Sequence, residues 1–307
     1  MKPSKGTYRI RVPASAANLG PGLDTLALAL SLHLEVAIKI SKKFKIEVAG
    51  IGQEQIPTTK EANLVYKAFS ALCQKMKDKT PELEILIQND IPPARGIGSS
   101  ASGIVAGLLA ANSIMGYKLN RSDLLQTAAQ VEGHADNPAA SLFGGCVVVT
   151  RENDRIFWGR VSTPPQLKVV LFIPDFEIPT QKARKILPKN VPLEDAVFNV
   201  QRAALLVSSL AESDFEMLKL STKDRLHEDT RVKAFYPRVY DLAYAAKDAG
   251  AKGEFLCGSG SSIGAFAVEK PDYIANIMEE KAAEIGIAGT TTIVSPDTVG
   301  AVVEEID

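Results

Sequence analysis

The alternation of apolar and polar positions predicts that the chain begins with β-strands. Residues 8–12, 34–40, 44–50 and 83–88 each alternate in this way, which is the period of a strand with one face buried. Only three polar residues separate the second of these segments from the third, so we expect the two to pair as a hairpin.

Helical periodicity predicts helices between and after these strands, and two of them begin at a capping residue, Asn63 in one and Asn120 or Ser122 in the other. The C-terminal half also contains a glycine turn between two apolar segments, which predicts a second hairpin. The expected helices span residues 63–76, 100–111, 120–132, 193–211, 236–249 and 274–285; the hairpin turns at 258–260, and an edge strand spans 290–295.

A glycine-rich loop follows the strand predicted over residues 83–88. Pro92 and Pro93 end that strand, because proline has no N–H to donate to a sheet. Residues 96–100, Gly-Ile-Gly-Ser-Ser, then lead into the apolar helix predicted over residues 100–111. Glycines allow backbone N–H groups to converge, and a helix N-terminus attracts anions. The segment therefore predicts a phosphate-binding loop.

This loop matches neither of the two common nucleotide motifs. A P-loop has Lys followed by Ser or Thr after its last glycine, whereas Ser99 and Ser100 follow Gly98. The dinucleotide fingerprint has a third glycine where this chain has Ala101. On the loop alone, an ordinary tight turn capped by serine stays open as an alternative.

Two further segments combine polar side chains with turn-forming residues. The loop predicted over residues 13–24 consists mostly of small residues, and its strongly polar groups are Asn18 and Asp24. Both could bind a ligand, but a turn role for Asn18 and a helix-capping role for Asp24 are equally good alternatives.

Residues 132–138 contain the densest set of functional groups in the chain, with Glu132, His134, Asp136 and Asn137 at the end of a predicted helix. This density favours a functional site, and the alternative is a capped helix end that leads into an Asn-Pro turn. A zinc site is disfavoured, because the chain has only three histidines and no His-Glu-x-x-His or paired-cysteine spacing.

Composition narrows the class of protein. The 307 residues include 35 Lys and Arg against 36 Asp and Glu, so we expect neither nucleic acid nor a membrane surface as a partner. The three cysteines are widely spaced, which indicates free thiols in a reducing compartment. The longest apolar run, near residues 104–115, is too short to span a bilayer. We therefore expect a cytoplasmic protein.

The motifs bear a family resemblance. Residues 91–102 resemble the ATP-binding motif of the GHMP kinases, the superfamily of galactokinases and of homoserine, mevalonate and phosphomevalonate kinases. Residues 12–26 and 132–145 resemble the homoserine kinases within that superfamily. Nearly the whole chain is covered, with small departures: Ile97 stands where leucine is usual, and Ser261 where proline is common.

The resemblance implies an α+β fold of two domains with the active site between them. A ribosomal-S5-like ATP-binding domain is expected over residues 1–163 and a ferredoxin-like domain over residues 164–307. The implied reaction is ATP-dependent phosphorylation of the side-chain hydroxyl of L-homoserine, a step of threonine biosynthesis. Another GHMP small-molecule kinase of the mevalonate-pathway type, or a non-catalytic binding protein on this fold, are the alternatives, and a homodimer is left open.

The resemblance also implies residue roles. Ser100 and Glu132 match Mg²⁺ ligands, which suits a cation that takes few protein oxygens besides phosphate and water. Direct attack by the substrate hydroxyl is favoured, with Asn18 and Asn137 orienting it and His134 as a base only in a minor alternative. The residues expected to hold homoserine are Asn18, Asp24, His134, Asn137, Arg184 and Arg231, where two arginines suit a carboxylate and an aspartate suits an ammonium group. Those expected to bind ATP are Asn63, Pro92, Pro93, Ala94, Arg95, Gly96, Ile97, Gly98, Ser99, Ser100, Ala101 and Ser102.

Without the resemblance, the sequence pattern does not indicate a functional role for Arg184 or Arg231. Each lies in a charged segment, over residues 180–185 and 224–231, and in most proteins such segments are solvated surface. Their assignment to a carboxylate rests on analogy alone.

Overall fold

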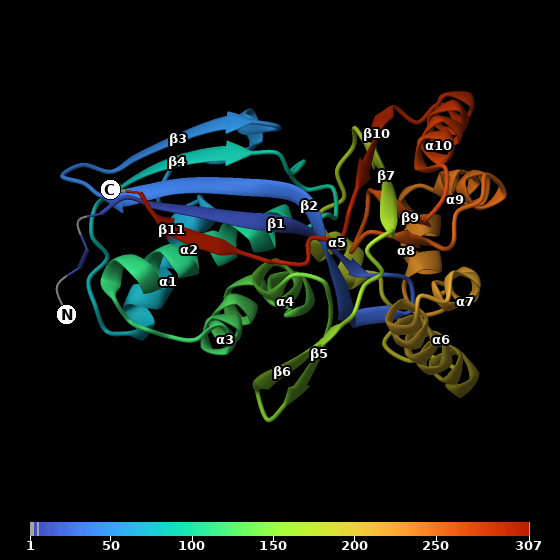
Figure 1. Ribbon diagram of the computed structural model, residues 1–307, viewed down its shortest axis with the longest axis horizontal. Coiled ribbons are helices and arrows are strands. Elements are labelled where there is room, and N and C mark those ends of the chain that lie inside the picture. The colour runs from blue at the N-terminus through green and yellow to red at the C-terminus, as the bar shows by residue number, and fades with distance from the viewer. Residues whose placement is uncertain (1–2, 5, 307) are drawn as a thin grey trace.

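The computed structural model describes residues 3–4 and 6–306, and it contains two β-sheets with helices packed against them (Figure 1). The strands are β1 (Tyr8–Asn18), β2 (Gly22–Ile40), β3 (Lys45–Gly50), β4 (Leu83–Asn89), β5 (Cys146–Glu152), β6 (Arg155–Val161), β7 (Lys168–Pro174), β8 (Glu254–Leu256), β9 (Ile263–Ala267), β10 (Gly289–Val294) and β11 (Val302–Glu305). The helices are η1 (Gln53–Gln55), α1 (Leu64–Lys75), α2 (Ser99–Met115), α3 (Arg121–Glu132), α4 (Asp136–Phe143), α5 (Thr180–Lys185), α6 (Leu193–Glu212), α7 (Phe215–Ser221), α8 (Glu228–Phe235), α9 (Val239–Asp248) and α10 (Pro271–Ile285).

The first sheet is organised around β2, which is long enough to have different partners at its two ends. Its later half pairs with β4 and its early part with β5, while β1 lies along its other edge. The strand order is β11-β1-β2-β4-β3, with β5 and β6 attached beside β2. The N-terminal half therefore forms one continuous sheet that carries the helices α1–α4 on one face (Figure 1).

The expected hairpin between residues 34–40 and 44–50 is wrong. Both segments are strands, but β4 lies between β2 and β3, antiparallel to the former and parallel to the latter. The hairpin prediction placed β3 directly beside β2. In the structure β4 occupies that position, and its Ile85 and Ile87 are buried. Periodicity indicates which face of a strand is buried, but it does not identify the strand beside it.

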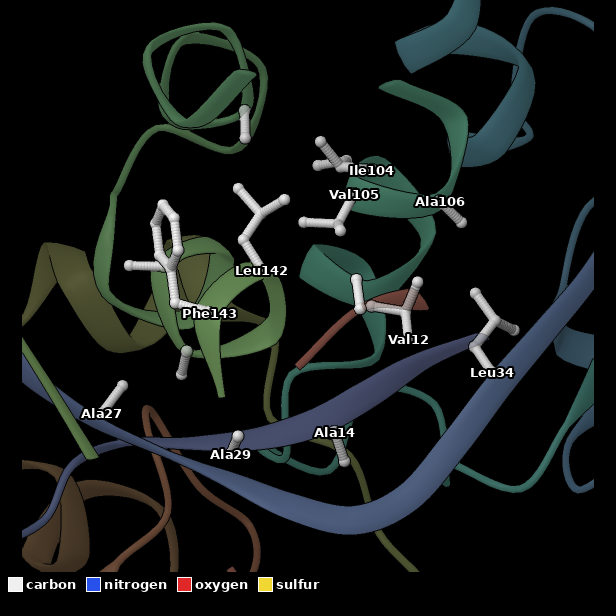
Figure 2. Close-up of a cluster of buried hydrophobic side chains, with 14 of the residues drawn as sticks. Val12, Ala14, Ala27, Ala29, Leu34, Ile104, Val105, Ala106, Leu142 and Phe143 are labelled. Carbon is white, nitrogen blue, oxygen red and sulfur yellow. The ribbon is translucent and has the colours of Figure 1, made fainter. Parts of the chain in front are cut away.

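The loop expected over residues 13–24 is also mostly strand. β1 continues to Asn18 and β2 starts at Gly22, so only a tight turn separates them. Ala14, one of the small residues that suggested a loop, is buried, and Figure 2 shows it with Ala29 of β2 in a cluster that also contains side chains of α2 and α4. Small residues are used here because they allow the helices to approach the sheet closely.

The predicted helices of the N-terminal half are confirmed. Asn63 caps α1, where its side chain accepts a hydrogen bond from the Tyr66 N–H, and Asn120 caps α3 in the same way. The apolar helix after the glycine loop extends from Ser99 to Met115 and is buried on nearly all sides, as expected for a helix without a polar face.

The second sheet has the order β10-β7-β9-β8, and all its pairs are antiparallel. The hairpin of β8 and β9, the edge position of β10 and the helix before it are confirmed. A second cluster of buried apolar residues joins this sheet to α9 and α10 through side chains such as Leu242 and Met278. The two halves of the molecule thus have partly separate cores.

The domain boundary between residues 163 and 164 stays a prediction. The last strand, β11, belongs to the first sheet although it follows the second sheet in the chain. After β10 the chain crosses back, and β11 pairs with β1 at the edge of the first sheet. The three cysteines are free and buried. In the described part of the chain, no helix is both long enough and apolar enough to cross a membrane.

Candidate active site

A polar cavity lies where the first sheet, the glycine loop and the second half of the chain meet. Six short segments contribute to its wall: the turn between β1 and β2, the loop before α2, the end of α3 with the start of α4, helix α5, helix α8 and the turn between β8 and β9. The residues that line it are Ala17, Asn18, Asp24, Ala94, Arg95, Gly96, Gly98, Ser99, Ser100, Glu132, His134, Asp136, Asn137, Thr180, Arg184, Arg231, Gly258 and Ser259.

The conformation of the glycine loop requires glycine at two positions, Gly96 and Gly98. Gly96 has φ 79° and Gly98 has φ 78°, which is the left-handed region that favours glycine. A Cβ on Gly98 would collide with the Ser15 backbone, and one on Gly96 with the turn between β8 and β9. No side chain caps the start of α2 among the described residues, so its first N–H groups are available to an anion. This favours the phosphate loop over the serine-capped turn.

Ser100 and Glu132 form a pair of oxygen ligands beside this loop. The Ser100 hydroxyl donates to Glu132 Oε2 at 2.7 Å, and the Glu132 side chain is only 10% exposed. Burial raises the pKa of Glu132, although the charge of His134 and the Ser100 hydrogen bond act in the opposite direction. No group of three or more His, Cys, Asp or Glu side chains in the described residues could hold a metal. The two hard oxygens of Ser100 and Glu132 suit a cation such as Mg²⁺ that takes its other ligands from phosphate and water.

His134 lies between two carboxylates. Its Nδ1 is 2.8 Å from Asp136 Oδ1 and its Nε2 is 3.4 Å from Glu132 Oε1. Burial lowers the pKa of His134, but the hydrogen bond to Asp136 and the charges of both carboxylates outweigh it and raise the pKa overall. A histidine held in its protonated form donates hydrogen bonds and is a poor proton acceptor. The geometry thus disfavours His134 as a general base.

Asp136 is a cavity residue that the sequence did not assign a role. Its side chain is 2% exposed, and Oδ1 accepts hydrogen bonds from both His134 and the Asn137 N–H. Its place within the dense segment 132–138 was the available signal. Asp136 thereby fixes His134 and the first turn of α4 together.

The two asparagines differ in how much of their side chain is already bound. Asn18 donates to the Gly258 carbonyl at 2.8 Å and accepts from the Asp24 N–H at 3.1 Å, so both ends of its amide are used. The Asn137 side chain accepts from the Ser15 hydroxyl at 2.9 Å through Oδ1. Asn18 therefore ties the two halves of the molecule together, whereas Asn137 lines the cavity and its amide nitrogen makes no hydrogen bond within the part of the chain that the structure describes.

Asp24 and Arg184 form an ion pair across the cavity. Two hydrogen bonds of 2.7 and 3.0 Å join the carboxylate on β2 to the guanidinium on α5. The Asp24 and Arg184 side chains are 46% and 36% exposed. Burial raises the pKa of Asp24, but the hydrogen bonds and charge of Arg184 outweigh it and lower the pKa overall.

Arg231 has the opposite environment, because it is 2% exposed. It donates to the Gly258 carbonyl at 3.1 Å, to the Ala183 carbonyl at 3.4 Å and to Nδ1 of His227 at 2.9 Å. Burial and the nearby charge of Arg184 lower the pKa of Arg231. Its hydrogen bonds go to neutral groups, and the charges of Asp24 and Asp224 offset the effect of burial only in part. An anionic ligand in this cavity would add a directly bonded negative charge.

A mostly apolar groove opens next to the glycine loop and continues from the polar cavity, with a volume of about 270 Å³. Ala94, Ser99, Ser100 and Thr180 line both spaces. An apolar groove that ends at a phosphate loop has the character of a nucleoside site. Its remaining wall consists of Leu34, Gln55, Ile56, Pro57, Asn63, Leu64, Val65, Ile87, Pro93 and Gly103.

Four residues of the expected ATP-binding set lie outside the lining of both spaces. Ile97 and Ala101 are fully buried in the core, and the Ser102 hydroxyl donates to the Pro13 carbonyl at 2.9 Å. Pro92 is the fourth. Arg95 does line the cavity, and its guanidinium donates to the carbonyls of Pro174 and Asp175 at 2.8 Å each, so it anchors the loop to the second half of the chain.

Comparison with known proteins places this site in a family. The family model "GHMP kinases N terminal domain" matches residues 63–145, and "GHMP kinases C terminal" matches residues 206–286. The homoserine kinase of Desulfitobacterium hafniense is 36% identical over 296 residues, which cover 96% of this chain and 99% of the relative. The homoserine kinase of Caldanaerobacter subterraneus is 40% identical over 278 residues, 90% of this chain and 88% of the relative.

Solved structures agree with this assignment. A crystal structure of homoserine kinase from Cytophaga hutchinsonii superposes with a TM-score of 0.86 at 30% identity and covers 99% of both chains. The mevalonate kinase of L. major, solved with R-mevalonate, has a TM-score of 0.69 at 18% identity over 96% of this chain and 98% of that one. The second likeness is one of fold alone.

Proposed function

The chain belongs to the homoserine kinase family of the GHMP kinases, and from this premise we propose how its cavity transfers the γ-phosphoryl group of ATP to the side-chain hydroxyl of L-homoserine. The products are ADP and O-phospho-L-homoserine, an intermediate of threonine biosynthesis. One observation carries the proposal: an aspartate and two arginines that can bind an amino-acid zwitterion face the N-terminus of a glycine-loop helix in a single cavity.

ATP is proposed to lie along the glycine loop. Its adenine enters the apolar groove that Asn63 and Pro93 help to line, and its phosphates extend towards the start of α2. There the left-handed Gly96 and Gly98 direct backbone N–H groups towards the phosphate oxygens. Of the expected ATP-binding set, Ile97, Ala101 and Ser102 support the loop from the core rather than touch the nucleotide.

Ser100 and Glu132 are proposed to hold Mg²⁺. Their oxygens lie together at the end of the phosphate site, and oxygen ligands are those this ion prefers. The bound ion supplies charge neutralisation to the phosphates. Glu132 must be ionised for this role. Burial raises the pKa of Glu132, and the positive charge of His134 acts in the opposite direction; a bound cation would favour the ionised form further.

We propose that homoserine binding breaks the ion pair between Asp24 and Arg184 and that each of the two side chains then forms an ion pair with the substrate. A zwitterion offers its carboxylate to Arg184 and its ammonium group to Asp24, so each side chain keeps a partner of the opposite charge. Arg231 adds a second, buried guanidinium to the carboxylate. A molecule with only one of the two charges leaves either Asp24 or Arg184 unpaired, which is the physical basis of selectivity here.

Direct attack of the homoserine hydroxyl is the favoured mechanism. Both ring nitrogens of His134 lie against carboxylate oxygens, of Asp136 and of Glu132, so His134 is poorly placed to accept the hydroxyl proton. Asn137 orients the hydroxyl through its amide, and the proton passes to a phosphate oxygen of the transferred group. Asn18 contributes by fixing the wall of the cavity, since its amide is already bound.

The alternatives have less support. Mevalonate has a carboxylate but no ammonium group, so it would leave Asp24 without a partner, and the similar mevalonate kinase is far less identical than the homoserine kinases. A non-catalytic binding protein has no use for the paired Ser100 and Glu132. A homodimer and a cytoplasmic location stay predictions.

An ADP-release assay with homoserine, mevalonate, galactose and shikimate tests the function. We expect turnover with homoserine and only background with the other three, each assayed with and without Mg²⁺. Preferential turnover of mevalonate, or tight homoserine binding with no ADP release, would contradict the proposal.

A further inference from the structure

His227 lies directly behind Arg231, outside the wall of the cavity. It is fully buried, and its ring makes one hydrogen bond from each nitrogen. Nε2 is 2.8 Å from the carbonyl oxygen of Gly20, in the turn between β1 and β2, and Nδ1 is 2.9 Å from Nη1 of Arg231. The ring thus connects the first sheet to the buried arginine.

These two partners determine the protonation state of the ring. A carbonyl oxygen only accepts, so Nε2 must carry the hydrogen; a guanidinium only donates, so Nδ1 must be the bare acceptor. Burial lowers the pKa of His227 and the charge of Arg231 lowers it further, while the charge of Asp224 acts in the opposite direction. The imidazole is therefore neutral, with a single tautomer.

The surrounding chain holds the ring in place. Asp224 accepts hydrogen bonds through Oδ2 from the backbone N–H groups of Leu226, His227 and Glu228 and so fixes the start of α8. The Asp224 carboxylate is 3.8 Å from Nε2 of His227, beyond hydrogen-bond distance. Gly20 has φ 89°, and a Cβ there would collide with the Thr222 backbone, so its carbonyl direction is also determined by packing.

Arg231 needs such support because its role depends on direction. A guanidinium binds a carboxylate well only when its planar N–H groups face the two oxygens. Its other hydrogen bonds go to the carbonyls of Gly258 and Ala183, and the second of these is long at 3.4 Å. The acceptor on His227 provides a side-chain anchor at the N-cap of the same helix, four residues before Arg231.

We propose that His227 is a positioning residue, whose neutral ring holds the Arg231 guanidinium in the orientation that receives the carboxylate of the amino-acid substrate. The inference rests on the proposed role of Arg231 and extends it to a residue that does not touch the substrate. It also assigns a purpose to the turn at Gly20, which anchors the opposite side of the ring.

The test is a set of single and double variants assayed for KM, kcat and thermal stability. His227→Phe keeps the ring volume and removes both hydrogen bonds, so we expect KM for homoserine to rise about tenfold or more, with KM for ATP unchanged. His227→Gln offers a donor and an acceptor on one amide group and should restore most of the affinity. In an Arg231→Ala background, His227→Phe should add less than about twofold, because the residue through which it acts is gone.

Val232→Ala is the matched control, since Val232 is the next buried residue of α8 and belongs to the apolar core. It should lower the melting temperature and leave KM for homoserine unchanged, which separates positioning from stability. If His227→Phe does not fold, His227→Asn takes its place, with the same direction and a smaller rise in KM expected.

Three outcomes would overturn the inference. One is an unchanged KM for homoserine in His227→Phe, or in His227→Asn if that variant is used, together with a raised KM in Arg231→Ala. A second is a full additive effect of the His227 change in the Arg231→Ala background. The third is a rise in KM for ATP equal to that for homoserine. Normal homoserine affinity in Arg231→Ala itself would instead contradict the proposed function, so the two failures are distinguishable.

Discussion

The proposed phosphate end and the proposed amino-acid end of the cavity are built in different ways. At the phosphate end, residues 93–100 are consecutive, and their donors are backbone N–H groups whose directions follow from two left-handed glycines. At the amino-acid end, Asp24, Asn137, Arg184 and Arg231 come from β2, α4, α5 and α8 and act through side chains. One end is a local structure, and the other exists only once the chain has folded.

The amino-acid end also contains a difference within itself. Arg231 is 2% exposed and bound on several sides, whereas the Arg184 side chain is 36% exposed and pairs with Asp24. A buried, oriented guanidinium loses little freedom when a ligand binds, while an exposed one must first exchange its partner. We therefore infer that Arg231 provides a fixed anchor and Arg184 an adaptable one.

The largest expected effect comes from removing the carboxylate of the substrate, which changes contacts at the amino-acid end only. The wild-type protein should reject the amino alcohol that lacks the homoserine carboxylate by about 10⁴-fold in kcat/KM, because buried polar groups lose their partner. KM for ATP should be the same with both acceptors. Loss of this discrimination in the Arg184→Ala/Arg231→Ala double variant supports the clamp. Full preference for homoserine in that variant would return both arginines to a structural role.

Next in size is the pair at the phosphate end. Glu132→Gln and Ser100→Ala should each lower Mg²⁺-dependent kcat by about 10²-fold or more, since charge compensation of the phosphates is reduced. The affinity for homoserine, measured by calorimetry, should change little, which would show that the substitutions affect the phosphate end and not the amino-acid end. Near-normal turnover in both variants would exclude the metal assignment.

The two arginines should then differ from each other. Arg231→Ala should lower kcat/KM for homoserine by about 10²-fold, and Arg184→Ala by less, because charged hydrogen bonds in a buried site are worth more than exposed ones. Their combined effect should be less than additive, since either change allows the substrate to shift. Equal and additive losses would contradict the fixed and adaptable anchors.

Asn137 lies where the two ends meet and should have a smaller, mainly kinetic effect. Asn137→Ala removes an orienting amide, so kcat should fall about tenfold with little change in KM for homoserine. Steady-state kinetics at saturating ATP measure both. A raised KM at unchanged kcat would make Asn137 a binding residue only.

The smallest effect is a pH-dependent stability at the same junction. The pKa of His134 is raised above its ordinary 6.5, so its interactions with Asp136 and Glu132 stabilise the folded state fully below pH 6.5, and this contribution is lost as pH rises through the folded pKa. His134→Gln should therefore be less stable than wild type by about 1 kcal/mol at pH 6, with the gap narrowing towards pH 8.5. Urea unfolding in the presence of EDTA measures it. A gap that widens with pH would contradict the carboxylate-bound imidazolium.

Much of the fold was predictable because periodicity and caps are local signals. The helices opened by Asn63 and Asn120, the buried α2 and the hairpin around residues 258–260 agree with the structure. The glycine loop could be predicted as a phosphate site because backbone direction depends on the residues within it. Resemblance added the family, which the comparisons confirm.

The partners of those elements were decided by tertiary structure. The position of β4 between β2 and β3 left no trace in the alternation of either strand, since alternation specifies faces and not neighbours. Asp24 and Arg184 are 160 residues apart in the chain, and the charged segment that contains Arg184 looks like ordinary surface. His227 shows the same limit: only the folded chain brings the carbonyl of Gly20 to one side of its ring and Arg231 to the other. Sequence determines which chemistry a segment carries, whereas packing of the two sheets decides which groups face one another.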